Sequence, residues 1–451
     1  MIMKINRVGV LGSGVMGTQI AGVFANANIP TLLFGYQEHV KKDLDKIHTF
    51  KPEALTHPKQ ASWITPLSLE DDLAQLSNCD LVIEAIIEDI DAKQALFKKI
   101  TPHLNSEVIL ATNTSSLSVN QIGEKLGKFK SRFCGIHFFN PPRYMPLIEL
   151  ISTEETDGEI LDNLEGYFTS ELGKNILYAK DESGFIANRI GVFSIVACIH
   201  HAQRLSLGFD TVDALTGVKL KRPKSATFRT ADLVGLDILK HVFEQFERAH
   251  TNDPWHHYFK TPEWLNTMVG NHLLGEKTKG GLYKKEDGII KIYQPENQSY
   301  VKAIYDIDKS VKEILKKDTS KQLTLLKSNK HPQAQFLYSV IKDTCLYSAY
   351  HLKDIAHSTR DIDWALHWGF GWEVGIFEYW QINGVEQSLA LFLEGNEEVS
   401  TPNWLNDVAD FYIEEGAYSP MEKSFVAYSD HSIYQRQLHR PTLMGESNKE
   451  Q

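Results

Sequence analysis

Short apolar runs alternate with longer amphipathic stretches over roughly the first 180 residues of the chain. Residues 15–27 show the apolar spacing of a helix, and similar stretches separate the later apolar runs. Strands separated by helices form βαβ units, which build a parallel sheet covered by helices on both faces. We therefore predict a doubly wound α/β domain over residues 1–181. The predicted strands are residues 8–11, 31–34, 81–83, 108–111, 133–136 and 147–151.

From about residue 182 the pattern is helical. Residues 185–207 form one long stretch with helical spacing, and helical segments dominate the remainder. A polar, Lys-rich stretch around residues 284–335 and a polar tail after about residue 430 interrupt this pattern. We therefore predict an all-α part after the α/β domain. Its expected divisions are a first helical domain over 182–300, a linker over 301–334, a second helical domain over 335–430 and a tail over 431–451.

The two helical domains resemble one another in sequence. Asp213, Phe228 and Gly235 of the first recur as Asp363, Phe377 and Gly384 of the second, at offsets of 150, 149 and 149 residues. Chance similarity between apolar helices is the alternative, but it does not predict a near-constant offset. We therefore expect a duplicated helical module.

The composition is that of an ordinary globular protein and argues against several classes. The chain has 451 residues with 47 Lys and Arg against 58 Asp and Glu, and this net charge of −11 disfavours a nucleic-acid or membrane partner. No apolar stretch approaches the ~18–20 residues that span a bilayer. Four widely spaced cysteines form no CxxC pair, and the N-terminus lacks a secretory signal. Both features favour a cytoplasmic protein with reduced thiols and no metal.

A glycine-rich turn follows the first predicted strand and opens the first predicted helix. It has the pattern GxGxxG, with Gly12, Gly14 and Gly17, and with Val15 and Met16 before the last glycine. In this context Gly12 permits a tight turn, Gly14 lets the backbone approach a pyrophosphate, and Gly17 lets helix and strand pack closely. The free N–H groups at the start of the helix bind the phosphate charge. The motif therefore predicts a dinucleotide cofactor in a Rossmann-type domain.

The second half of this fingerprint is different in this chain. An acidic residue at the end of the second strand normally accepts the ribose hydroxyls, but residues 31–34 lead into Gly35. No Arg stands there to receive a 2′-phosphate, and Lys41 and Lys42 lie one helical turn further on. Cofactor choice is therefore open at this position. An aspartate introduced at Gly35 is expected to widen a preference for NAD.

A second candidate site combines His137 with Glu149. His137 ends a predicted strand and precedes an Asn140-Pro141 turn, which places it at the sheet edge where α/β folds bind ligands. Glu149 is a charge inside an apolar strand, so it needs a polar partner. An imidazole twelve residues earlier, on an adjacent strand, is one such partner. On composition alone, a satisfied core histidine and an edge carboxylate are an equally favoured alternative.

Six motifs, taken in order, resemble the L-3-hydroxyacyl-CoA dehydrogenase family of fatty-acid β-oxidation. They are Gly12–Gly17, Asp80-Leu-Val-Ile-Glu-Ala85 with Glu88 and Lys93, Asn113-Thr-Ser115-Ser116, His137-Phe-Phe-Asn-Pro141, Glu149, and Gly184-Phe-Ile-Ala-Asn188-Arg189. The likeness extends to about residue 430, and the region around Trp368 resembles long bacterial members with two helical C-terminal modules. The resemblance implies an NAD-dependent (S)-3-hydroxyacyl-CoA dehydrogenase with acyl-CoA as its substrate.

The resemblance also implies a role for each matching residue. His137 would take the proton of the substrate 3-hydroxyl while hydride leaves C3, and Glu149 would orient the imidazole. Ser115 and Asn188 would hold the substrate oxygen. The residues implied around cofactor and substrate are Glu88, Lys93, Asn113 and Lys277.

Two other functions are the alternatives to this one. A dehydrogenase of free 3-hydroxy acids resembles this fold but relies on a catalytic Lys in place of a His–Glu pair. A non-catalytic cofactor-binding scaffold beside other β-oxidation enzymes is the alternative from a different class. The altered position at Gly35 and a segment after it that looks shorter than in relatives keep the scaffold in consideration.

The duplicated module implies a pseudo-dimeric monomer. In single-module relatives, the helical domains of two chains pair through apolar faces, and a duplicated module makes that pairing within one chain. Asn188 follows Phe185 by three residues, whereas Ser339 stands three residues after Phe336. We therefore expect the second copy to be non-catalytic and the chain to bind one cofactor.

Overall fold

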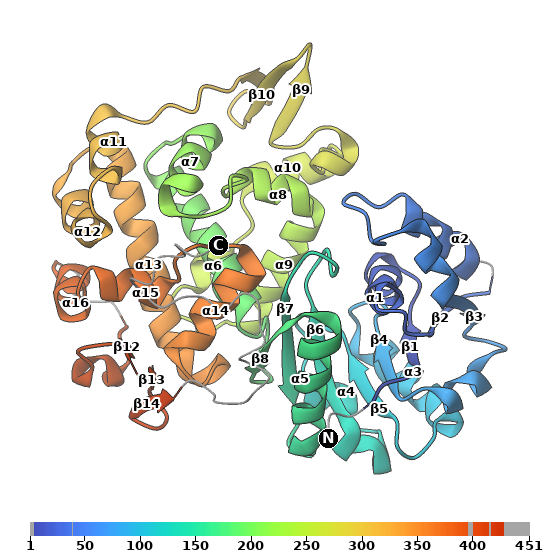
Figure 1. Ribbon diagram of the computed structural model, residues 1–451. Coiled ribbons are helices and arrows are strands. Elements are labelled where there is room, and N and C mark those ends of the chain that lie inside the picture. Colours follow the sequence, from blue (N-terminus) through green and yellow to red (C-terminus); the bar gives the residue numbers. More distant parts are fainter. Residues whose placement is uncertain (1–3, 38, 396–399, 415, 428–451) are drawn as a thin grey trace. The chain divides into compact units, whose positions relative to one another are not determined.

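The chain forms two compact units (Figure 1). The structure is a computed structural model that describes residues 4–427, apart from 38, 396–399 and 415. The first unit extends to Ile186 and includes Asp354–His357, and the second comprises Ala187–Lys353 and Ser358–Ala427. The predicted tail over residues 431–451 lies outside the described residues.

An eight-stranded sheet forms the centre of the first unit, with the order β3-β2-β1-β4-β5-β6-β7-β8. Strands β1 to β6 run parallel, whereas β7 pairs antiparallel with β6 and β8 follows the direction of β7. The order β3-β2-β1-β4-β5-β6 is that of a dinucleotide-binding fold, so the predicted doubly wound α/β domain is confirmed. The strands are β1 (Val8–Leu11), β2 (Thr31–Gly35), β3 (Ile64–Ser68), β4 (Leu81–Glu84), β5 (Ile109–Thr112), β6 (Phe133–Phe138), β7 (Leu147–Ser152) and β8 (Asn175–Ala179).

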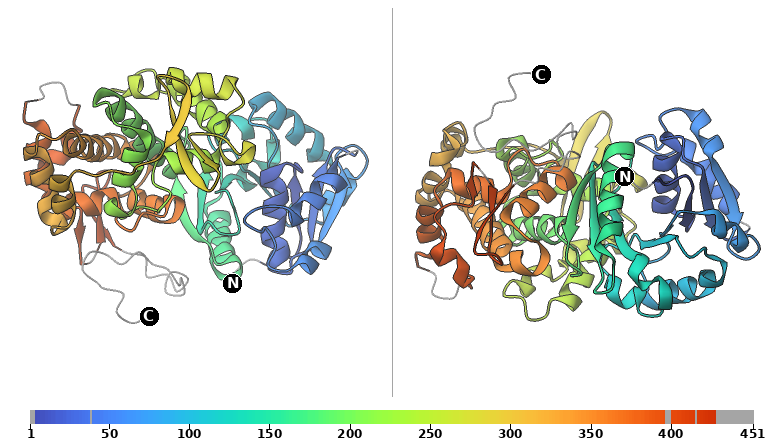
Figure 2. Two further views of the ribbon diagram at one scale, coloured as in Figure 1. Left: turned by 90° about the horizontal axis from the view of Figure 1, so that it is seen from above. Right: turned by 60° about the horizontal axis from the view of Figure 1, so that its bottom comes forward.

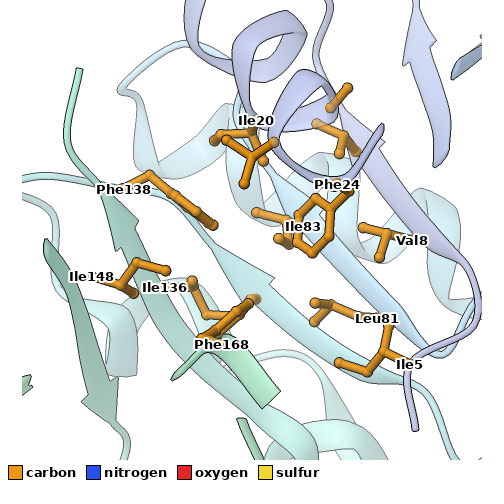
Figure 3. Close-up of a cluster of buried hydrophobic side chains, with 14 of the residues drawn as sticks. Ile5, Val8, Ile20, Phe24, Leu81, Ile83, Ile136, Phe138, Ile148 and Phe168 are labelled. Atoms are coloured by element: carbon orange, nitrogen blue, oxygen red, sulfur yellow. The ribbon is translucent and has the colours of Figure 1, made fainter. Parts of the chain in front are cut away.

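Helices cover both faces of this sheet (Figures 1 and 3). On one face, Phe24 and Phe168 pack with Ile83 and Ile136 in a continuous apolar cluster. Burying each such side chain contributes about 2 kcal/mol, so this packing holds the helices firmly on the sheet. On the other face, a Cβ at Gly123 would lie 2.6 Å from the Phe133 ring, so only glycine fits there. The helices are α1 (Val15–Asn26), α2 (Val40–Asp45), α3 (Ile90–Ile100), α4 (Val119–Gly123) and α5 (Gly158–Leu172).

The second unit is mainly helical, as predicted, and carries two small antiparallel sheets that were not predicted. These sheets are the yellow and red strands of Figure 2, β9 (Tyr283–Glu286) with β10 (Ile289–Gln294) and β11 (Ser299–Lys302), and β12 (Tyr412–Ile413) with β13 (Gly416–Ser419) and β14 (Ser424–Ala427). The helices are α6 (Ala187–Arg204), α7 (Phe209–Thr216), α8 (Phe228–Val234), α9 (Leu236–Ala249), α10 (Glu263–Gly270), α11 (Lys309–Leu315), α12 (Thr319–Ser328), α13 (Pro332–Ile355), α14 (Thr359–Phe370), α15 (Ile376–Ile382) and α16 (Val385–Leu393).

The expectation of a linker over residues 301–334 is wrong. That segment contains α11 and α12, whose inward residues Val311, Leu323 and Leu326 are fully buried. Asp308 and Asp318 accept hydrogen bonds from the first-turn N–H groups of these helices and so cap them. The many lysines lie on the solvent side of the two helices. Their charge made the segment look like a linker, although its apolar residues have the spacing of amphipathic helices.

A buried carboxylate organises the first helical module. Asp213 of α7 accepts hydrogen bonds from the N–H groups of Phe228, at 2.6 Å, and Arg229, at 2.9 Å, at the start of α8. The hydroxyl of Tyr283, from β9, donates to the same carboxylate at 2.7 Å. One side chain therefore holds together a helix, the start of the next helix and the following sheet.

The second module contains the same arrangement at the offset expected from the sequence. Asp363 of α14 accepts from the N–H groups of Phe377 and Glu378 at the start of α15, both at 2.9 Å. The hydroxyl of Tyr412, from β12, donates to this carboxylate at 2.5 Å. The tyrosine that completes each site comes from the first strand of the small sheet that follows each module.

Two further observations concern membrane spans and metal sites in the part of the chain that the structure describes. None of their helices combines the length and apolar character needed to cross a membrane. Their His, Cys, Asp and Glu side chains form no group of three or more that could hold a metal ion.

Candidate functional site

The glycine-rich turn between β1 and α1 is shaped for close approach to a ligand. Gly12 has φ +117°, and a Cβ there would lie 2.5 Å from the carbonyl oxygen of Ala85, so this position requires glycine. A Cβ at Gly17 would overlap the Gly12 carbonyl oxygen. By contrast, a Cβ at Gly14 would meet no atom within 4 Å. Gly14 therefore faces open space beside the start of α1.

The N-terminus of α1 offers donors to that space. Gly14 is the N-cap residue and supplies no side-chain hydrogen bond, while the N–H of Thr18 makes the first bond back to the Gly14 carbonyl. The N–H groups of Val15, Met16 and Gly17 precede that bond and are unpaired within the helix. These donors at the positive end of a helix fit a pyrophosphate group, so the site suits the dinucleotide that the fold implies.

At the end of β2, Ser13 lies where a side chain of residue 35 would otherwise be, and it contacts Asp43. A Cβ at Gly35 would lie 2.8 Å from the Cβ of Ser13, so Ser13 already fills the space of a side chain there. The hydroxyl of Ser13 donates a 2.8 Å hydrogen bond to Oδ2 of Asp43 in α2, whose other oxygen lies 2.7 Å from Nζ of Lys46. Burial alone would raise the pKa of Asp43, but Lys46 and Ser13 outweigh it and lower the pKa. Asp43 was not among the predicted site residues, because it reaches this place through the packing of α2 beside β2.

A buried ion pair lies where β4 ends. The ammonium of Lys93, from α3, is 1% exposed and lies 2.7 Å from Oε1 of Glu84 and 3.3 Å from Oε2 of Glu88. The Oε2 atom of Glu84 also accepts a 2.6 Å hydrogen bond from Thr112 of β5, and burial raises its pKa. Glu84 was not predicted as a site residue, although a charge at the end of an apolar strand is the same signal that drew attention to Glu149.

Glu88 connects this ion pair to the loop after β5. Its Oε1 atom accepts hydrogen bonds from the N–H of Ser115 at 2.8 Å, from the N–H of Ser116 at 3.1 Å and from the Thr114 hydroxyl at 2.6 Å. Burial alone would raise the pKa of Glu88, but Lys93 and these donors outweigh it and lower the pKa. Glu88 is thus held as a carboxylate, and it fixes the backbone that carries Ser115.

His137 and Glu149 form a direct pair across β6 and β7. They stand opposite each other in the antiparallel register, and Nδ1 of His137 lies 2.7 Å from Oε2 of Glu149. His137 is 4% exposed and Glu149 is fully buried. With Nδ1 donating a hydrogen bond to the carboxylate, the imidazole carries its lone pair on Nε2. Among the residues that the structure describes, Nε2 of His137 has no hydrogen-bond partner, and it is therefore available to a ligand.

Neighbouring residues fix the orientation of this pair. The rings of Phe139 and Phe185 lie 4.4 and 5.5 Å from the His137 ring, between centroids. The N–H of Ile186 donates a 3.1 Å hydrogen bond to Oε1 of Glu149. Next to the histidine, the N–H of Phe138 donates to the side-chain oxygen of Asn113 at 2.9 Å, which ties the end of β5 to β6.

The first unit therefore gathers most of the predicted site residues at one edge of its sheet. The glycine-rich turn follows β1, Glu88 follows β4, Asn113 and Ser115 follow β5, and His137 lies near the end of β6. Ligands of open α/β sheets bind outside this edge. Two predicted residues belong to the second unit: Asn188 in α6 and Lys277, whose Nζ lies 2.5 Å from Oδ1 of Asp237. Their proximity to the edge stays a prediction.

Two family models match consecutive parts of the chain. A model described as 3-hydroxyacyl-CoA dehydrogenase, NAD binding domain, matches residues 7–182. A second, described as 3-hydroxyacyl-CoA dehydrogenase, C-terminal domain, matches residues 184–285.

Individual relatives agree with these matches. A probable 3-hydroxyacyl-CoA dehydrogenase of Bacillus subtilis is 35% identical over 443 residues, or 91% of this chain, which spans only 55% of that relative's length. A probable 3-hydroxyacyl-CoA dehydrogenase of Deinococcus radiodurans is 40% identical over 292 residues, covering 63% of this chain and 84% of the relative. The solved structure of 3-hydroxybutyryl-CoA dehydrogenase from Escherichia coli K12 has a TM-score of 0.69 at 21% identity. It covers 90% of this chain and 98% of its own, which shows a shared fold.

Proposed function

This chain belongs to the 3-hydroxyacyl-CoA dehydrogenase family, and we propose that it oxidises (S)-3-hydroxyacyl-CoA to 3-oxoacyl-CoA with NAD in fatty-acid β-oxidation. The observation that carries the proposal is the 2.7 Å contact between Nδ1 of His137 and Oε2 of Glu149, at the same sheet edge as the glycine-rich turn. A base whose second nitrogen is free, beside a dinucleotide site, suits oxidation of an alcohol.

The reaction needs two groups to leave the substrate together. Bound NAD supplies the acceptor for the hydride that leaves C3. The hydroxyl proton passes to Nε2 of His137, the C3–O bond becomes a carbonyl, and the imidazole becomes an imidazolium. Glu149 stabilises that cation through Nδ1 and holds the ring in place, as in other His–acid pairs. Reduction by the same site reverses each transfer.

The other site residues position the substrate and the cofactor in this proposal. Ser115, whose backbone Glu88 fixes, holds the substrate oxygen, and the proposal assigns Asn188 to the same oxygen. Asn113 stands beside the backbone of Phe138, next to the base. Glu88, Lys93 and Lys277 contribute charge around the cofactor. Because Lys93 is 1% exposed and paired with two carboxylates, it acts mainly by holding Glu88 in place.

We further infer that the second helical module is a non-catalytic duplicate of the first. Support comes from Asp213 and Asp363, which bind the start of the next helix and a strand tyrosine in the same way. A Cβ at Gly191 of α6 would overlap the ring of Phe370 in α14, so the two modules meet closely. In the proposal, this contact takes the place of the pairing between two chains that the resemblance implies for single-module relatives, which gives a pseudo-dimeric monomer with one cofactor site.

A spectrophotometric comparison tests the proposed reaction. NADH formation is followed with 3-hydroxybutyryl-CoA, a long-chain 3-hydroxyacyl-CoA and free 3-hydroxybutyrate as substrates. The proposal predicts turnover of at least one thioester and none of the free acid. Turnover of the free acid alone would establish the free-acid dehydrogenase, and tight NADH binding without any turnover would establish the scaffold; either result contradicts the proposal.

A further inference from the structure

The second unit contains a cavity of about 510 Å³ that has no part in the reaction described above. Three segments and Ile341 of α13 line it. The segments are residues 218–222 of the first module, residues 315–322 where α11 leads into α12 (Figure 1), and residues 372–379 at the start of α15. The N–H of Glu373 donates a 2.8 Å hydrogen bond to the carbonyl of Lys221 and joins two of these walls. The cavity is thus built where the two modules and the segment between them meet.

The charge of this cavity is opposite to that of the chain. Its lining contains five basic residues and one acid, namely Lys219, Lys221, Arg222, Lys316, Lys317 and Asp318. The local balance is therefore strongly positive in a chain whose net charge is −11. Asp318 already accepts hydrogen bonds from Ser320 as the cap of α12. Such a lining raises the local concentration of small anions.

The guanidinium of Arg222 is a buried charge without a counter-ion. Arg222 is 9% exposed, and its guanidinium lies 3.6 Å from the centre of the Trp372 ring. The titratable neighbours of Arg222 among the described residues include no carboxylate, and its side-chain hydrogen bond goes to the thiol of Cys198. Its other neighbours, Cys198 and Cys345, are neutral, because burial raises the pKa of Cys198 to about 11 and raises the pKa of Cys345 well above its ordinary value. Burial lowers the pKa of Arg222 only to about 10, so the charge persists at neutral pH.

A second unpaired donor lines the same cavity. The hydroxyl of Tyr379 is buried and has no hydrogen-bond partner among the described residues. Buried polar groups are normally hydrogen-bonded, and buried charges are normally paired. One oxyanion in the cavity would accept hydrogen bonds from both Arg222 and Tyr379. Arginine is the residue best suited to phosphate, because its planar fork donates two parallel hydrogen bonds.

We propose that this cavity binds a phosphate-bearing ligand the size of a nucleoside diphosphate. Its phosphates lie against Arg222 and Tyr379, with the exposed lysines at the mouth. The apolar residues Leu220, Ile341 and Ile376 line the remainder and accept the uncharged part of the ligand. The volume lies within the range of ~300–1,000 Å³ that small-molecule pockets occupy. A nucleoside diphosphate occurs both as free ADP and within CoA, so these two sources share the chemistry of the site.

Titration calorimetry on the full chain tests this proposal independently of the dehydrogenase reaction. Saturating NADH is present throughout, so that the glycine-rich turn of the first unit is filled. The probes are ADP, CoA and pyrophosphate. We expect ADP to bind at one site per chain, and at least tenfold more tightly than pyrophosphate. Because CoA also enters the proposed substrate site, its binding to this cavity is taken as the part that Arg222→Leu and Tyr379→Phe remove. Equal affinity of that part and of ADP identifies the shared diphosphate as the recognised group, and tighter binding of that part identifies CoA as the ligand.

Three variants locate the binding. Arg222→Leu should lower the affinity at least tenfold, and Tyr379→Phe, which keeps the ring, should lower it several-fold with NADH binding unchanged. Arg248→Leu, on the exposed side of α9, is the matched control and should leave binding intact. Absence of binding for ADP and CoA, tighter binding of pyrophosphate, or unchanged affinity in both Arg222→Leu and Tyr379→Phe would each overturn the proposal. Tyr379→Phe answers the question even if Arg222→Leu fails to fold.

Discussion

Ser13 donates a 2.8 Å hydrogen bond to the carboxylate of Asp43, directly beside the point where β2 ends. Dinucleotide-binding folds usually place an acid at that point, on the strand itself. Here the strand ends in Gly35, and the carboxylate comes from α2 instead. Asp43, held in place by Ser13, provides the negative charge that the end of β2 itself lacks.

Asp43 should therefore favour NAD over NADP, because its carboxylate repels a 2′-phosphate. Asp43→Asn keeps the acceptor for Ser13 but removes the charge, and should lower the ratio of kcat/KM for NAD to that for NADP by about tenfold. Asp45→Asn, an exposed position in the same helix, is the control and should leave the ratio unchanged. An unchanged ratio in Asp43→Asn would show that the acid does not select the cofactor.

Introducing an acid at Gly35 should not widen the preference for NAD, contrary to the expectation from sequence. A side chain there meets Ser13, whose Cβ would lie 2.8 Å from the new Cβ. Gly35→Asp alone should raise the KM for NAD, and the double variant Ser13→Gly with Gly35→Asp should recover it. A stronger preference for NAD in Gly35→Asp alone would show that Ser13 moves aside at little cost, which would contradict this prediction.

The two tyrosines that complete the repeated carboxylate sites should be equally important for stability. Tyr283→Phe and Tyr412→Phe each remove a hydroxyl donor from a buried carboxylate, which costs about 1.5–3 kcal/mol. Thermal unfolding should show a fall of several degrees in Tm for both variants. The control Tyr144→Phe alters an exposed ring and should leave Tm unchanged. A fall for only one of the two would contradict a structurally equivalent repeat.

Hydrophobic patterning predicted the parallel sheet because its central strands are buried on both faces and appear as continuous apolar runs. The edge strand β3 was not predicted, because only its first and last residues are buried and because it contains Pro66. The sheet of β9, β10 and β11 was not predicted, because its strands are short and contain four lysines. Its hairpin signal, Asp287-Gly288, was present, and both residues have positive φ as such a turn requires.

Lys174 should make the free energy of unfolding depend on pH in the alkaline range. Its Nζ donates to the carbonyls of Pro142 and Met145 in the turn after His137, and burial lowers its pKa to about 8. The unfolded chain keeps this proton up to the ordinary pKa near 10.5. Between these values the unfolded state binds more protons than the folded state, so stability rises with pH. Below about pH 8 both states hold the proton, and the residue contributes no slope.

A comparison with Lys174→Met isolates this effect. The difference in free energy of unfolding, wild type minus variant, should rise by up to ~1.4 kcal/mol per pH unit between about pH 8 and 10. Urea unfolding of the first unit, followed at pH 7.5, 8.5 and 9.5 in matched buffers, measures it. Parallel pH profiles for the two proteins would show that the ammonium is not destabilised by burial.

Asn188 and Ser339 occupy matching positions of the two modules and should differ in importance. Asn188→Ala should lower kcat by about 10–100-fold, because the role proposed for Asn188 is a hydrogen bond to the reacting oxygen. Ser339→Ala should leave kcat unchanged, since the Ser339 hydroxyl accepts a 3.1 Å hydrogen bond from Arg204 within the second unit. Equal effects of the two substitutions on kcat would contradict the prediction that only the first module contributes to catalysis.

The candidate site was more accessible to sequence reasoning than its supporting contacts. His137 and Glu149 could be paired because a charge in a buried strand needs a partner, and the register puts them opposite each other. Glu84 carried the same signal and was overlooked. Asp43 could not be found, because its place beside β2 depends on the packing of α2 and not on distance along the chain.

The proton acceptor is the central claim, and kcat of the His137→Gln variant tests it most directly. NADH formation from 3-hydroxybutyryl-CoA should fall by about 10²–10⁴-fold, while the dissociation constant of NADH stays within about twofold. Glu149→Gln should lose nearly as much, and the double variant should lose little more, because the pair acts as one unit. Near-normal kcat in His137→Gln would contradict the account.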